Sequence, residues 1–86
     1  MEDAGGNVDS ELGKRLKAAR AYGSLSQMEL SRKLGISSAT LIRYEKGRAE
    51  VPPLARRELA MRVSDLTGFN REWLLEAAEK EGSDGL

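Results

Sequence analysis

The chain has 86 residues, of which 40% are hydrophobic, and its 14 basic and 14 acidic side chains give a formal net charge of zero. It contains no cysteine and no histidine, which excludes disulfides and thiolate metal sites and removes the commonest general base. We therefore expect one small domain that is not an enzyme and needs no metal or cofactor. No apolar run approaches the roughly 18 residues of a membrane span, so no membrane partner is expected.

The neutral total conceals a basic middle segment. Residues 14–57 hold eleven basic side chains against three acidic ones, whereas residues 1–13 and 58–86 are acidic. This segregation is typical of a surface that meets phosphates on one side. A solvated surface laced with salt bridges is the alternative interpretation.

Helical spacing begins after a short lead-in. Residues 1–8 are small and acidic without periodicity, so we expect them to be disordered. Apolar residues at i, i+4 and i+7 then predict a helix over about 10–22, which Gly23 would end. The apolar residues of this stretch are Leu12, Leu16 and Ala19.

Two short helices separated by a glycine turn come next. Ser26 and Glu29 have the spacing of a capping box, which predicts a helix from Gln27 to the turn at Gly35. Ser37 is placed to cap a third helix over 37–46, and Gly47 would end it. Two such helices joined by a short turn form the helix-turn-helix plan.

Two further helices complete an all-α fold of five short helices. Pro53 can open the fourth, whose apolar stripe we assign to Leu59, Val63 and Leu66 before Gly68. Asn70 can cap the fifth, whose apolar face would be Trp73, Leu74, Ala77 and Ala78. The predicted domain spans residues 9–78, and residues 79–86 are expected to form a flexible acidic tail.

The third helix has an outward face suited to a DNA groove. Leu41 and Tyr44 would point inward with Ile36, which leaves small or hydroxylated residues and one arginine outside: Ser37, Ser38, Ala39, Thr40 and Arg43. The first turns of the second and third helices have free N–H groups and a partial positive charge. Residues there, Ser26 and Gln27 among them, are therefore placed to hold a phosphate. Lys46 and Arg48 would lie beside the sugar-phosphate backbone.

Segment 26–47, SQMELSRKLGISSATLIRYEKG, resembles the helix-turn-helix of the lambdoid phage repressor and Cro type, also called the Xre type. The matching positions include Gln27, Glu29, Gly35, Tyr44 and Glu45, and the similarity continues through GFNREWLL at 68–75. It covers about residues 11–76. The resemblance implies a lambda-repressor-like DNA-binding domain in the cytoplasm of a prokaryotic cell or phage-infected host, bound to a double-stranded operator as a homodimer.

The resemblance also implies individual roles. Ser37, Ser38, Ala39 and Arg43 would face bases. Gln27 would contact a phosphate and brace the third helix, while Ser26, Thr40, Lys46 and Arg48 would lie by the backbone. Arg20 and Glu45 would form a partly buried ion pair. Trp73 and Leu74 could contact a second copy, although an indole at helical spacing more often belongs to the core. Ser31 departs from the alanine usual at its position and brings a hydroxyl that needs a partner.

These observations favour a sequence-specific transcriptional regulator, most readily a repressor, with no small-molecule ligand. A protein-interaction module of the antitoxin or antirepressor type, using the last helix and the acidic tail, is the alternative. A carboxylate metal site at Glu72, Glu76 and Glu79 is a weaker idea, because three acids at helical spacing also form an ordinary solvated stripe.

Overall fold

The computed structural model describes residues 11–83, with side chains as far as Glu79. This part of the chain forms five helices and no strand: α1 Glu11–Tyr22, α2 Gln27–Leu34, α3 Ser38–Lys46, α4 Pro53–Thr67 and α5 Arg71–Ser83. The predicted all-α fold is thereby confirmed. The expected disordered lead-in, residues 1–8, lies outside the described residues.

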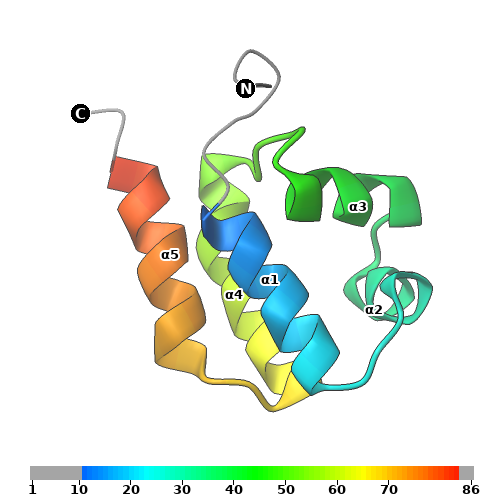
Figure 1. Ribbon diagram of the computed structural model, residues 1–86. Helices are drawn as coiled ribbons and strands as arrows, with labels where there is room; N and C mark the ends of the chain where they lie inside the picture. The colour runs from blue at the N-terminus through cyan, green and yellow to red at the C-terminus, as the bar shows by residue number, and fades with distance from the viewer. Residues whose placement is uncertain (1–10, 84–86) are drawn as a thin grey trace, which may run out of the picture.

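The helices fall into two groups (Figure 1). α1, α4 and α5 pack side by side along similar directions, and α2 and α3 lie together at one side of them. α3 packs against α1 and α2, and α2 also contacts α4. The helix-turn-helix unit is therefore mounted on a three-helix support.

Local capping explains where α2 and α3 begin and end. The Glu29 N–H donates to Ser26 Oγ at 3.0 Å and the Ser26 N–H donates to Glu29 Oε1 at 2.8 Å, which is a complete capping box. Both helices end at a glycine in the left-handed region, Gly35 at φ 78° and Gly47 at φ 75°. These helix limits agree with the sequence predictions.

α1 ends at Tyr22, as predicted, but Gly23 does not adopt the left-handed conformation expected of it. The left-handed residue there is Ser24, at φ 59°, and Gly23 has another purpose. A Cβ at Gly23 would lie 3.0 Å from both Cα and Cβ of Thr67 on α4. Gly23 therefore allows the close approach of α1 to α4, a requirement that local sequence does not reveal.

α5 is longer than the sequence suggested. Its helix continues through Ser83, past the domain limit placed at residue 78. Glutamate and lysine are good helix formers, and one glycine costs only about 1 kcal/mol in a helix. The charged composition of residues 79–83 is therefore compatible with helix.

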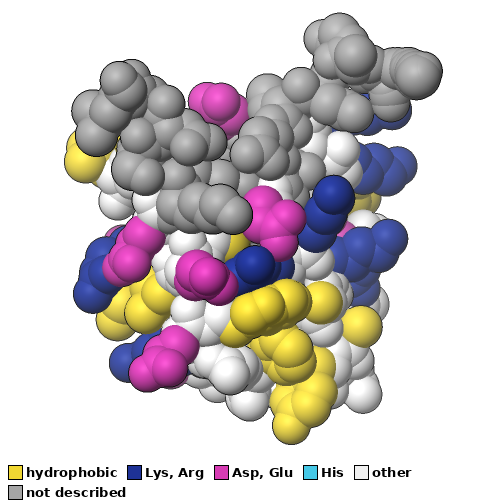
Figure 2. Space-filling view, turned by 60° about the vertical axis from the view of Figure 1, so that its left-hand side comes forward, with side chains coloured by type: hydrophobic (Ala, Val, Ile, Leu, Met, Phe, Trp, Pro, Cys, Tyr) yellow, Lys and Arg dark blue, Asp and Glu magenta, His cyan; other side chains and the backbone are white. Residues whose placement is uncertain are grey.

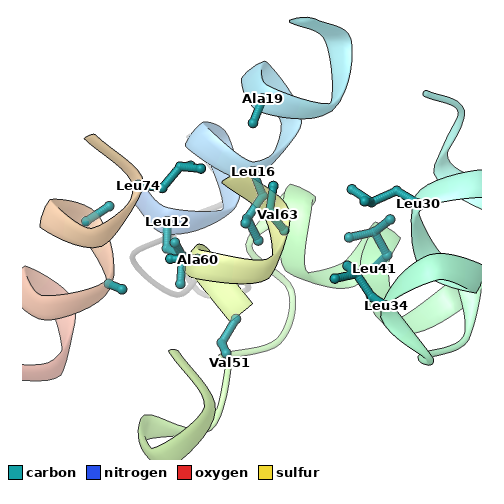
Figure 3. Close-up of a cluster of buried hydrophobic side chains, with 12 residues drawn as sticks. Leu12, Leu16, Ala19, Leu30, Leu34, Leu41, Val51, Ala60, Val63 and Leu74 are labelled. Atoms are coloured by element: carbon teal, nitrogen blue, oxygen red, sulfur yellow. The ribbon is translucent and has the colours of Figure 1, made fainter. Parts of the chain in front are cut away.

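One core joins both helix groups (Figure 3). Leu12, Leu16 and Ala19 of α1 are buried, as predicted, and they share this core with leucines of α2 and α3. On α4 the prediction was partly wrong, because Leu66 is exposed. α4 faces several neighbours along a wider stripe, whose buried members are Arg56, Ala60, Val63, Ser64 and Thr67.

Arg62 fixes the helix-turn-helix unit on α4. Its guanidinium donates to the carbonyl oxygens of Lys33 at 2.9 Å and Leu34 at 3.1 Å. These carbonyls lie at the C-terminal end of α2, where a cation is favoured by the helix dipole. Local sequence patterns do not reveal this contact, since the two segments are far apart in the chain.

Candidate nucleic-acid interface

α3 presents one buried side and one exposed side. Leu41 and Glu45 are buried, and Tyr44 is partly buried against the core. Ala39, Arg43 and Lys46 are exposed. Because these three residues recur at i, i+4 and i+7, they form one continuous stripe along the helix. Arg43 thus points to solvent with a small residue one turn before it, as the predicted base-reading face requires.

A buried carboxylate holds the opposite side of α3. Glu45 accepts from Arg20 Nε at 2.8 Å, from Arg20 Nη2 at 3.2 Å and from Gln27 Nε2 at 3.1 Å. Arg20 also donates to the carbonyl oxygen of Leu25 at 3.1 Å. Three elements, α1, α2 and α3, are therefore joined at one charge. Gln27 uses one amide N–H here, and a second N–H remains that could meet a phosphate.

Two hydroxyls at the start of α3 are tied to each other. Ser37 Oγ accepts the Thr40 N–H at 3.0 Å as the N-cap and donates its own proton to Thr40 Oγ1 at 2.9 Å. Because Thr40 Oγ1 acts as the acceptor in this contact, the proton of its own hydroxyl is not used by it. A phosphate oxygen is a pure acceptor, so this arrangement suits the backbone role expected for Thr40.

Ser38, the next candidate base reader, has a partner on α2. Its Oγ lies 3.1 Å from Oγ of Ser31, and Ser31 Oγ donates to the carbonyl oxygen of Met28 at 2.9 Å. Ser31 itself is buried, with 3% of its surface exposed. The hydroxyl flagged in the sequence as a departure is therefore fully accommodated between the two helices.

The surface of the helix-turn-helix unit carries excess positive charge. Within residues 26–48 the only exposed acid is Glu29, which is occupied by the capping box. The exposed cations of the same segment are Arg32, Lys33, Arg43, Lys46 and Arg48. No ion pair is recorded for these five among the side chains that the structure describes. Ser26, expected beside a phosphate, is also exposed at the start of this unit.

Two other bases of the middle segment, Arg15 and Arg57, are paired with acids outside this surface. Arg15 contacts Glu11 at 2.8 Å and Glu76 at 2.9 Å, and the pKa of its guanidinium is raised chiefly by the hydrogen bond to Glu76. Arg57 pairs with Glu79. The count of basic residues in the sequence therefore overstates the available positive charge.

The predicted dimer contact is partly wrong. Leu74 is 0% exposed and belongs to the core, so its side chain has no surface for a second copy. Trp73 is half-buried: its ring meets Phe69 edge-on at 5.0 Å and lies under the Arg15 guanidinium at 4.7 Å. Adjacent positions on a helix differ by about 100°, which explains why Trp73 reaches the surface and Leu74 does not.

The α5 side of the molecule has a different character (Figure 2). Acidic and basic side chains alternate there, and hydrophobic side chains gather at the end where α1 stops and α5 begins. Of the acids considered for a metal, Glu76 contacts Arg15 and Glu79 pairs with Arg57. No cluster of three potential metal ligands occurs among the described residues.

A family model described as a helix-turn-helix domain matches residues 11–74, three quarters of the chain. The chain belongs to the helix-turn-helix family. The match covers the support helices as well as the helix-turn-helix unit, and it confirms the family that the motif at 26–47 implied. Neither the curated proteins nor the solved structures include a significant match. No helix in residues 11–83 has the length and apolarity to cross a bilayer.

As a helix-turn-helix domain, the protein places a DNA-binding motif on α2 and α3. In this motif the second helix enters the major groove while the first crosses the sugar-phosphate backbone. In this helix-turn-helix domain the second helix of the motif is α3, on which Ala39 and Arg43 are exposed.

Proposed function

We propose that the protein is a sequence-specific transcriptional regulator of the lambdoid repressor and Cro type, which represses a prokaryotic or phage promoter by occupying its operator. α3 reads bases in the major groove, and its flanking cations hold the two strands. The observation that carries this proposal is the exposed stripe of Ala39, Arg43 and Lys46 on a helix whose other side is fixed by Glu45.

Each exposed group has a chemical counterpart on a duplex. An arginine can donate two hydrogen bonds to O6 and N7 of guanine, and an alanine methyl can contact the methyl group of thymine. Lys46 and Arg48 carry charges that suit phosphates. The Arg20–Glu45 pair keeps α3 at a fixed angle to α1, so base contacts would be made without reordering the helix.

A single short helix gives few contacts, so we propose that two copies bind two half-sites. Their centres would then lie about 34 Å apart, one turn of the duplex. Binding of the second copy becomes effectively intramolecular once the first is in place, which raises the overall affinity.

The proposal is tested with three single arginine replacements and a library of randomised duplexes. Arg43→Ala should remove discrimination at one base position, at a cost of about 1 to 3 kcal/mol. Arg48→Ala should weaken all sequences alike and lower the slope of log affinity against log salt by about 1. Arg71→Ala, which removes an exposed arginine paired with Asp65 on the support, is the matched control.

The outcomes separate this proposal from the protein-interaction alternative. Loss of base discrimination confined to Arg43→Ala, with Arg71→Ala unchanged, supports DNA recognition through α3. Equal effects of Arg43→Ala and Arg48→Ala on all sequences would refute the assigned roles. Tight binding to a second polypeptide with no affinity for any duplex would favour the antitoxin or antirepressor type. The apolar face of α5 argues against that alternative, because Leu74, Ala77 and Ala78 are already buried.

A further inference from the structure

The hydroxyls of Ser31 and Ser38 form a chain whose direction the structure defines. A serine hydroxyl has one proton to donate and two lone pairs to accept. Ser31 gives its proton to the Met28 carbonyl oxygen at 2.9 Å, and a carbonyl oxygen cannot return one. The 3.1 Å contact between Ser31 Oγ and Ser38 Oγ therefore needs its proton from Ser38.

This direction determines what Ser38 offers to a ligand. Once its proton points toward Ser31, the Ser38 oxygen presents only lone pairs on its outer side. Ser31 is 3% exposed, so water does not compete for the inner end of the chain. Ser38 itself is half-buried at the first turn of α3, so the residue keeps some exposed surface on the side away from Ser31.

We propose that Ser31 is a specificity-determining positioning residue: it fixes Ser38 as a pure acceptor, so the base that meets Ser38 carries an exocyclic amine. In the major groove such amines are N6 of adenine and N4 of cytosine, whereas O4 of thymine and O6 of guanine are acceptors. A freely rotating serine could pair with either kind of group. This inference rests on the proposed function, because it names the base class read at one position of α3.

Binding-site selection with the full chain tests the inference in two steps. Ser38→Ala first identifies the position that Ser38 reads, as the one where base preference is lost. In the wild type that position should hold adenine or cytosine on the contacted strand, favoured over thymine and guanine by about three- to tenfold, the value of one net hydrogen bond. Ser31→Ala should then relax the preference at that same position and leave the other positions unchanged.

Two further variants keep the test specific. Ser64→Ala removes another buried serine hydroxyl, one that donates to the Phe69 carbonyl oxygen on the support, and it should leave every base preference intact. The double variant Ser31→Ala with Ser38→Ala should show the same preference as Ser38→Ala alone, because the two hydroxyls act as one unit. A purely structural role of Ser31 would instead weaken all duplexes equally.

The possible results are distinguishable. If the wild type selects sequences but Ser31→Ala keeps the full preference at the Ser38 position, the inference is overturned while the proposed function stands. A thymine or guanine preference at that position, or no position that responds to Ser38→Ala, overturns it as well. If the wild type selects no sequence at all, the proposed function fails, and the inference fails with it.

Discussion

Replacing Arg20 by alanine should be among the most damaging single changes in this protein. The Glu45 side chain is 2% exposed and that of Arg20 is 16% exposed, so the pair is largely removed from water. Arg20→Ala takes away two of the three hydrogen bonds to the Glu45 carboxylate and leaves only Gln27. An uncompensated buried charge costs about 3 to 5 kcal/mol.

That cost is large relative to the stability of a domain this small. Free energies of unfolding run at about 0.05 to 0.15 kcal/mol per residue, so the loss would be a sizeable part of the total. At about 4 to 8 °C per kcal/mol for a chain of this length, Arg20→Ala should lower Tm by at least about 12 °C. Urea titration followed by circular dichroism gives the free energy directly.

The exposed pair Arg71–Asp65 supplies the comparison. Its side chains are 50% and 66% exposed, so Arg71→Ala should change stability by no more than about 1 kcal/mol. Replacing both Arg20 and Glu45 by methionine should restore much of the loss, because no buried charge is then left unpaired. Equal losses for Arg20→Ala and Arg71→Ala would show that Glu45 does not depend on its arginine, and the account of how α3 is held would be wrong.

Gly23→Ala should lower the free energy of unfolding by about 1 to 3 kcal/mol through overpacking against Thr67; an unchanged urea midpoint would contradict the close approach. Hydrogen bonding from the Ser26 backbone lowers the pKa of Glu29. The ionised Glu29 carboxylate therefore contributes its full stabilisation of the fold above about pH 4.3, the ordinary pKa of glutamate, and this contribution is lost as the pH falls through the lowered pKa. Glu29→Gln should accordingly flatten the acid limb of a stability–pH curve, and identical limbs in both proteins would exclude this contribution. Arg62→Met should cost about 1 to 3 kcal/mol and speed amide hydrogen exchange in α2 more than in α5; uniform acceleration would argue against an anchor specific to α2.

The sequence predicted helix limits well because they are set by residues close in the chain. Ser26 with Glu29, Ser37, Gly35 and Gly47 each act on backbone groups within a few positions. The role of Gly23 is the exception, because it depends on a residue that is distant in the chain. Gly23 was assigned a local function, but its nearest constraint is Thr67, more than forty residues away, which no local pattern can show.

Interactions within the candidate site were predictable only in part. The structure brings Arg20 and Glu45 together as the family resemblance implied, and it places Arg43 outward. The direction of the Ser38–Ser31–Met28 chain was not predictable, although the sequence did flag the Ser31 hydroxyl as needing a partner. Hydrogen-bond direction depends on which acceptor lies within about 3 Å, and that is a property of packing.

The predicted dimer contact was also limited by packing that the sequence does not show. Helical periodicity groups Trp73 and Leu74 on one apolar face, but it cannot say which part of that face the neighbouring helices cover. Leu74, Ala77 and Ala78 are buried on α5, which packs against α1 and α4, and the Arg15 guanidinium lies over the ring of Trp73. If two copies bind adjacent half-sites as we propose, their contact would use side chains that remain exposed, and among the described residues the most exposed large apolar one is Leu54, at 98%. Leu54 is the second residue of α4 and follows Arg48 by only a few positions, so an apolar dimer contact that used it would lie next to the end of the DNA-facing segment and would not involve the buried Leu74.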